Sequence, residues 1–69
     1  MNPIIKDVIS YGIEKNYKFI YRNPCVVNPE DYIELHLEAK DVNLDAIWYK
    51  VKDCIENKDT KTIILIMKG

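Results

Sequence analysis

The sequence predicts an α+β domain with two helices packed on one face of a small three-stranded mixed sheet, in the order α-β-β-α-β. Three observations predict this class. The chain has 69 residues, which is enough for a single domain over residues 1–69 and too few for two. Two segments carry apolar residues at helical spacing, and two others alternate as strands do. The last segment is apolar without a break, which is typical of a strand covered on both faces.

The first element is a helix over about residues 3–15. Asn2 is a favourable N-cap, Pro3 suits the first helical position, and Asn16 suits the C-terminal end. Gly12 lets another segment approach the helix closely. The apolar face of the helix consists of Ile4, Ile5, Val8, Ile9, Gly12 and Ile13.

Two strands follow, over about residues 17–22 and 32–39, and the connector between them carries the turn residues Asn28-Pro29. The first strand is expected to pack an aromatic face beneath the helices, made of Tyr17, Phe19 and Tyr21. Its other face carries Lys18, Ile20 and Arg22. The second strand is expected to bury one set of side chains, Ile33, Leu35, Leu37 and Ala39. It exposes Tyr32, Glu34, His36 and Glu38.

A second helix is predicted over about residues 44–57, with Asn43 as its N-cap. Its apolar stripe consists of Leu44, Ile47, Trp48, Val51, Cys54 and Ile55. Residues 62–68 form the last strand, and the apolar run from Ile63 to Met67 predicts that it is central in the sheet. The second strand, the second helix and the last strand should form a right-handed βαβ crossover. The first strand should run antiparallel to one of the other two.

Two helices on one face leave the other face of the sheet open. The last strand turns outward either Thr62, Ile64, Ile66 and Lys68 or Ile63, Leu65 and Met67, so large aliphatic side chains lie next to Ile20 in both cases. Lys18 and Arg22, opposite Glu34 and Glu38, should form cross-strand ion pairs beside them. An apolar patch with a charged rim is typical of an interaction surface. The predicted interface residues are Ile20, Glu34, His36, Glu38, Ile64, Ile66 and Tyr49. The alternative is that the connector segment Cys25-Val26-Val27 folds back and covers this face.

The residues that carry chemistry form no complete catalytic or metal-binding set. Glu34, His36 and Glu38 share one strand face, but successive side chains there are nearly 7 Å apart, too far for three ligands on one ion. Cys25 and Cys54 are interpreted as small buried apolar residues rather than as a disulfide. Gly12 and Gly69 are the only glycines, so a phosphate-binding glycine loop is excluded. We therefore expect no enzyme activity, no cofactor and no metal.

The charge balance, ten Lys plus Arg against eleven Asp plus Glu, does not favour electrostatic binding of nucleic acid, so no nucleic-acid partner is expected. No apolar stretch is long enough to cross a membrane, and residues 1–8 do not resemble a signal peptide, so a cytoplasmic location is expected. The abundance of Ile, Lys and Asn indicates a bacterial or phage source with an AT-rich genome.

These observations favour a small non-enzymatic protein that acts through protein–protein contact, as a homodimer or as an inhibitor or adaptor of a larger protein. One alternative is a nucleic-acid-binding or transcription-modulating module. Its candidate phosphate contacts are Lys6, Lys15, Lys18, Arg22, Lys50 and Lys52. Another alternative is a small-ligand binder or oligomeric enzyme with a site at the subunit seam near His36.

Overall fold

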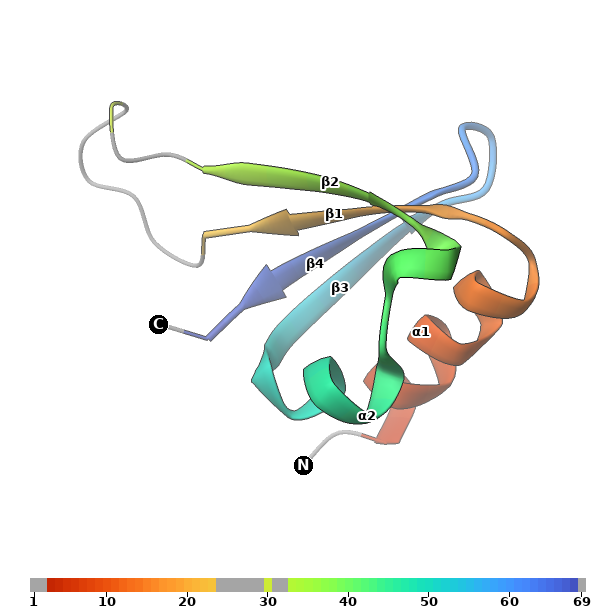
Figure 1. Ribbon diagram of the computed structural model, residues 1–69, viewed down its shortest axis with the longest axis horizontal. Helices are drawn as coiled ribbons and strands as arrows, with labels where there is room; N and C mark the ends of the chain where they lie inside the picture. Colours follow the sequence, from red (N-terminus) through yellow and green to blue (C-terminus); the bar gives the residue numbers. More distant parts are fainter. Residues whose placement is uncertain (1–2, 24–29, 31–32, 69) are drawn as a thin grey trace.

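The computed structural model describes residues 3–23, 30 and 33–68 (Figure 1). Its helices are α1 (Pro3–Glu14) and α2 (Leu44–Ile47), with short 3₁₀ turns η2 (Ala39–Asp41) and η3 (Trp48–Lys50). Its strands are β1 (Lys18–Arg22), β2 (Glu34–Glu38), β3 (Val51–Asn57) and β4 (Thr62–Met67). The predicted cap at Asn2, the turn at Asn28-Pro29, the outward Tyr32 and the covering segment 25–27 lie outside the described residues.

The strands form one mixed sheet in the order β2-β1-β4-β3. β1 pairs antiparallel with β2 and parallel with β4, and β4 pairs antiparallel with β3. The predicted α+β class is confirmed, as is the interior position of the last strand. The predicted number of strands was wrong, because the described sheet has four strands instead of three.

The extra strand, β3, occupies the segment predicted as the second half of the second helix. The helix begins where predicted, and the Asn43 side chain accepts a hydrogen bond from the Asp45 N–H at 3.2 Å. It ends after one turn, and Val51 continues into β3. A register shift between Val51 and Asp53 puts both Val51 and Cys54 opposite core-facing residues of β4. This bulge gives the apolar residues of a strand the three-residue spacing that is typical of a helix.

The predicted βαβ crossover is corrected by the same finding. β2 and β3 run parallel to each other at opposite edges of the sheet, since each is antiparallel to its neighbour in the parallel pair β1–β4. The helical segment from η2 to η3 therefore connects the two edge strands, and β4 returns beside β3 as a hairpin. The first strand runs antiparallel to the second, as predicted, but parallel to the last.

Both helices lie on the same side of the sheet (Figure 1), as predicted. α1 is followed by Asn16, which has a φ of 61°. The Tyr17 N–H donates to the Gly12 carbonyl at 2.8 Å and the Asn16 N–H donates to the Ile13 carbonyl at 3.2 Å. This pair of bonds is a Schellman motif, and it satisfies two terminal carbonyls while turning the chain directly into β1.

The core lies between α1 and the sheet, and four of its side chains are almost fully inaccessible: Phe19, Ile9, Ile63 and Leu65. Tyr17 is also buried and Tyr21 is half-buried, which confirms the predicted aromatic face of the first strand. The ring of Tyr17 meets that of Tyr11 edge to face, with centroids 5.7 Å apart. Burial of this single cluster is the main apolar contribution to the stability of the domain.

The predicted burial of β2 is correct only at one end. Ala39 is buried and Leu37 is half-buried, but Leu35 is 51% exposed and Ile33 is 62% exposed. All four alternate on the side of the helices, since Leu37 is opposite Phe19 and Leu35 is opposite Tyr21. β2 thus extends beyond the part of the sheet that the described helices cover. The apolar side chains in this part point to the helix side but are exposed to solvent.

None of the described helices is both long and apolar enough to cross a membrane. Cys54 is half-buried and its sulfur is a free thiol, and burial, followed by the nearby Asp53 and Glu56 carboxylates, raises the pKa of that thiol. Cys25 lies outside the described residues.

The close approach at Gly12 leads to a stability prediction. A β-carbon at this position would collide with Ile63 Cδ1 and lie 2.8 Å from Phe19 Cζ, both in the core. We expect Gly12→Ala to lower the free energy of unfolding by about 1–2 kcal/mol, because overpacking outweighs the gain in helix propensity. Urea denaturation measures the change. Ser10→Ala, at an exposed position of the same helix, is the control and should be neutral or stabilising; equal effects of both changes would contradict the prediction.

Alkaline pH should weaken the fold through its tyrosines. Burial raises the pKa of Tyr21, and the hydrogen bond with Tyr11, followed by burial, raises the pKa of Tyr17 above the ordinary 10.0. A raised pKa in the folded state means that these groups stabilise the fold fully below their ordinary pKa and lose this contribution as pH rises through the folded value. The free energy of unfolding should therefore fall above about pH 10, and Tyr21→Phe should make that fall smaller. Tyr49→Phe, at a 45% exposed ring, is the matched control.

Candidate functional site

The face of the sheet opposite the helices is the candidate functional site, and strand register fixes which side chains it carries. Ile20 of β1 is opposite Ile64 of β4, and Ile64 is in turn opposite Ile55 of β3. Ile63 and Leu65, the alternating neighbours of Ile64, are fully buried on the helix side. The structure therefore selects the predicted set Ile64 and Ile66, rather than Ile63, Leu65 and Met67, as the outward side of the last strand.

The centre of this open face is a patch of four isoleucines, Ile20, Ile55, Ile64 and Ile66, which we call the isoleucine patch. Ile55 is 47% exposed, and the other three are half-buried. The patch extends over the three adjacent strands β1, β4 and β3. Three of its members were predicted from the sequence. Ile55 was missed because its segment was assigned to a helix, where it belonged to the buried stripe.

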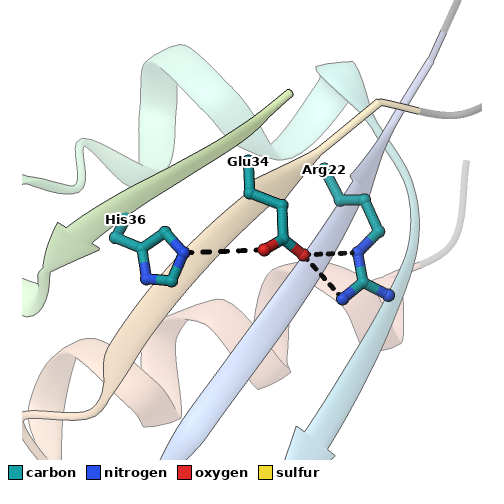
Figure 2. Close-up of polar contacts among 3 residues, drawn as sticks. All are labelled: Arg22, Glu34 and His36. Atoms are coloured by element: carbon teal, nitrogen blue, oxygen red, sulfur yellow. Dashed lines mark hydrogen bonds and ion pairs between the residues drawn. The ribbon is translucent and has the colours of Figure 1, made fainter. Parts of the chain in front are cut away.

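Charged side chains flank the patch on β1 and β2. Arg22 donates to Oε2 of Glu34 from both Nε, at 3.1 Å, and Nη2, at 2.8 Å (Figure 2). His36 Nε2 lies 3.6 Å from Oε1 of the same carboxylate. The side chains of Glu34 and Arg22 are about one-third exposed or less, and the imidazole of His36 is 69% exposed. The carboxylate of Glu34 in β2 therefore links β2 to β1 through Arg22. This confirms the predicted cross-strand ion pair of Arg22.

The second predicted cross-strand pair does not form. Lys18 is opposite Glu38 in register, but Glu38 Oε2 lies 3.4 Å from Lys40 Nζ in η2. Both side chains of this Glu38–Lys40 pair are more than two-thirds exposed, so the pair contributes little to stability. The carboxylate of Glu38 therefore lies next to η2, whereas that of Glu34 lies next to His36 and Arg22. The three predicted polar groups, Glu34, His36 and Glu38, do not meet at one point. The described chain contains no cluster of His, Cys, Asp and Glu that could hold a metal ion.

Tyr49 is the one predicted interface residue that the structure places away from this face. It lies in η3, 45% exposed, with its ring edge to face against Trp48 at 6.2 Å between centroids. Lys50 Nζ lies 5.8 Å from the Tyr49 ring centroid. The other six predicted interface residues, Ile20, Glu34, His36, Glu38, Ile64 and Ile66, share the open face.

The cations proposed for nucleic-acid binding are spread over the molecule. Lys6 Nζ lies 5.2 Å from the centre of the Trp48 ring on the helix side, and Arg22 is bonded to Glu34 on the opposite side of the sheet. Lys18 shares the open face with Arg22, whereas Lys52 lies at the bulge of the far edge strand. The arrangement does not form the continuous basic surface that a phosphate backbone requires.

A depression of about 410 Å³ lies where β1, β2 and β4 meet η2. Its lining includes the exposed His36 and both ends of the unformed pair, Lys18 and Glu38. It adjoins Ile20, so it is a recess at one border of the isoleucine patch.

No family model, curated protein or solved structure matches the chain.

A double-mutant cycle should measure the strength of the Arg22–Glu34 pair. Arg22→Met, Glu34→Gln and the double variant are compared by urea denaturation at low and high salt. We expect a coupling free energy of about 1 kcal/mol, because both side chains are partly shielded from water and share two charge-assisted bonds. The coupling should decrease at high salt, because salt screens the attraction between the two charges. Glu38→Gln with Lys40→Met is the control cycle at exposed positions, and it should give a smaller coupling. A coupling of zero for Arg22 and Glu34 would contradict the geometry.

Proposed function

We propose that this chain is a small non-enzymatic binding protein that docks onto a larger protein through the isoleucine patch. The observation that carries the proposal is the central strand β4. Its side chains are apolar on both faces, yet the described helices cover only the side with Ile63 and Leu65. A strand of this composition is typical of a sheet with a layer on each side.

The border of the patch fits a protein surface better than a polyanion. Charged residues of both signs surround it. The acidic ones are Glu34, Glu38 and Asp53, and the basic ones are Lys18 and Arg22. The guanidinium of Arg22 is already bonded to Glu34, which lowers its value as a phosphate contact. An apolar centre with a rim of mixed charge is the usual anatomy of a protein interface.

The dimensions of the patch suit a helix of the partner. Ile20, Ile64 and Ile55 lie side by side on three adjacent strands, which places the outer two about 10 Å apart. A helix with its side chains is about 10–12 Å wide. On the opposite side of the sheet, α1 already packs its apolar face against β3 and β4. We therefore propose that the occupant is the apolar side of a helix in a larger protein, packed as a second outer layer.

A second copy stacked face to face is less suitable on electrostatic grounds. In one arrangement the two-fold axis runs parallel to the strands, between β1 and β4, so that β2 of one copy lies over β3 of the other and Glu34 lies over Asp53. In the other arrangement the axis runs across the strands at the level of His36, so that β2 lies over β2 and Glu34 lies over Glu38. Both arrangements, which follow from the strand register, oppose like charges.

A photo-crosslinking amino acid in place of Ile64 should identify the partner in cells of the source organism. The same amino acid in place of Ile4, which is 64% exposed on α1, is the control. The captured protein is then purified and its affinity for the chain is measured by calorimetry. Ile64→Lys should weaken binding at least about tenfold, since it buries an ammonium group against an apolar surface. Ile4→Lys should leave the affinity unchanged.

Two results would count against the proposal. One is equal crosslinking from both positions, and the other is a purified partner whose affinity is unaffected by Ile64→Lys. Circular dichroism and urea denaturation of both variants establish that each is folded before binding is compared.

A further inference from the structure

The recess at the border of the isoleucine patch is lined by charged side chains of both signs. Lys18 comes from the start of β1, Glu38 from the end of β2, and Asp41 from η2. The volume of the recess, about 410 Å³, is within the range of pockets that hold small molecules. Its size and its charged lining together make it a candidate ligand site.

Strand register arranges the lining of the recess in two levels on the open face. Lys18 is opposite Glu38 on one side and Thr62 on the other, so these three residues form the first level. Two positions further along β1, Ile20 is opposite His36, and this pair forms the second level. The levels are about 7 Å apart, because side chains on one face of a strand are separated by two residues. The first level is polar, and the second has an aliphatic side.

The opposite charges that line the recess do not neutralise each other. The side chains of Lys18 and Asp41 form no ion pair or hydrogen bond with any other described residue. The Glu38 carboxylate contacts Lys40 instead, and both side chains of that pair are more than two-thirds exposed, so the pair is weak. An ammonium and a carboxylate that line one recess without meeting can each bind the opposite charge of a ligand placed between them.

We propose that this recess binds a free aliphatic α-amino acid, such as leucine, as a zwitterion. The ligand carboxylate accepts hydrogen bonds from the Lys18 ammonium, and the ligand ammonium donates to Asp41 and Glu38. The ligand side chain extends to the second level and packs against Ile20. The described lining of the recess does not include Ile64, the centre of the isoleucine patch, so this inference does not rest on the proposed function.

The charge balance around the recess selects a zwitterion over a simple ion. Two carboxylates, of Glu38 and Asp41, lie near two ammonium groups, of Lys18 and Lys40. An anion such as phosphate would approach both carboxylates, and a simple amine would approach both ammonium groups. A ligand with one charge of each sign gains an attraction on each side and avoids these repulsions.

The second level favours an aliphatic side chain of some length. A ligand whose α-carbon lies at the first level needs a branched side chain to reach the half-buried Ile20, about 7 Å further along the strand. The single methyl group of alanine is too short for this contact. Each buried methylene strengthens binding by up to about fourfold, so leucine should bind at least about fivefold more tightly than alanine.

An NMR titration of the ¹⁵N-labelled chain with L-leucine tests the site. The amide signals of the lining residues should shift together with a dissociation constant on the order of 1 mM, weak because the recess is open to solvent. L-Leucinamide lacks the carboxylate, and 4-methylpentanoate lacks the ammonium group. Each analogue should bind about fivefold more weakly than leucine, because each loses one charged contact.

Two variants assign the two charged contacts. Lys18→Met should weaken leucine binding about fivefold and abolish the preference for leucine over leucinamide. Asp41→Asn should reduce the preference for leucine over 4-methylpentanoate. Lys52→Met and Asp7→Asn are the matched controls at exposed positions outside the recess, and both should bind leucine like the unmodified chain. The spectrum of each variant also establishes that it is folded.

Three results would overturn the proposal. They are the absence of any shift up to about 50 mM leucine, equal binding of leucine and both analogues, and unchanged leucine binding by Lys18→Met. Ile64→Lys changes the isoleucine patch and not the recess, so this variant should bind leucine normally. Loss of partner binding with intact leucine binding, or the converse, therefore assigns each result to its own site.

Discussion

The parallel pairing of β1 with β4 is the interaction on which the remaining architecture depends. It joins two local hairpin units, β1–β2 near the N-terminus and β3–β4 at the C-terminus, into one sheet. The residues that meet in it are far apart in sequence, as in the pair Phe19 and Ile63, and both of these are fully buried beneath α1. Without this pairing each hairpin would expose an apolar face, and an isolated hairpin is at best marginally stable in water.

The same pairing determines what is left on the outside. Once β1 and β4 are the inner strands, β2 and β3 become the edges, and the helical connection between them crosses one face. The other face keeps the isoleucine patch, with Ile20 and Ile64 at its centre. Both described helices lie on the other side of the sheet, so none of the described helices covers this face. The apolar composition of β4 on both of its sides is what makes the uncovered face apolar.

Local sequence patterns determined most of the elements of this protein. The alternation in β1 placed Phe19 inside and Ile20 outside, and Asn16 and Asn43 marked the ends of helices through their own backbone and side-chain geometry. The uninterrupted run of β4 indicated an interior strand. These predictions succeeded because each depends on neighbouring residues alone, and six of the seven predicted interface residues consequently share the open face.

Only the tertiary structure decided the identity of residues 51–57, the strand order and the accessibility of β2. A bulge in β3 gives Val51, Cys54 and Ile55 a spacing that also fits a helix, and hydrogen bonding to β4 determines which conformation forms. Ile33 and Leu35 follow the pattern of a buried strand face, yet they are exposed because α1 and α2 do not extend that far along the sheet. Local periodicity specifies which side of a strand is apolar, whereas the length and position of the covering helices determine how much of that side is buried.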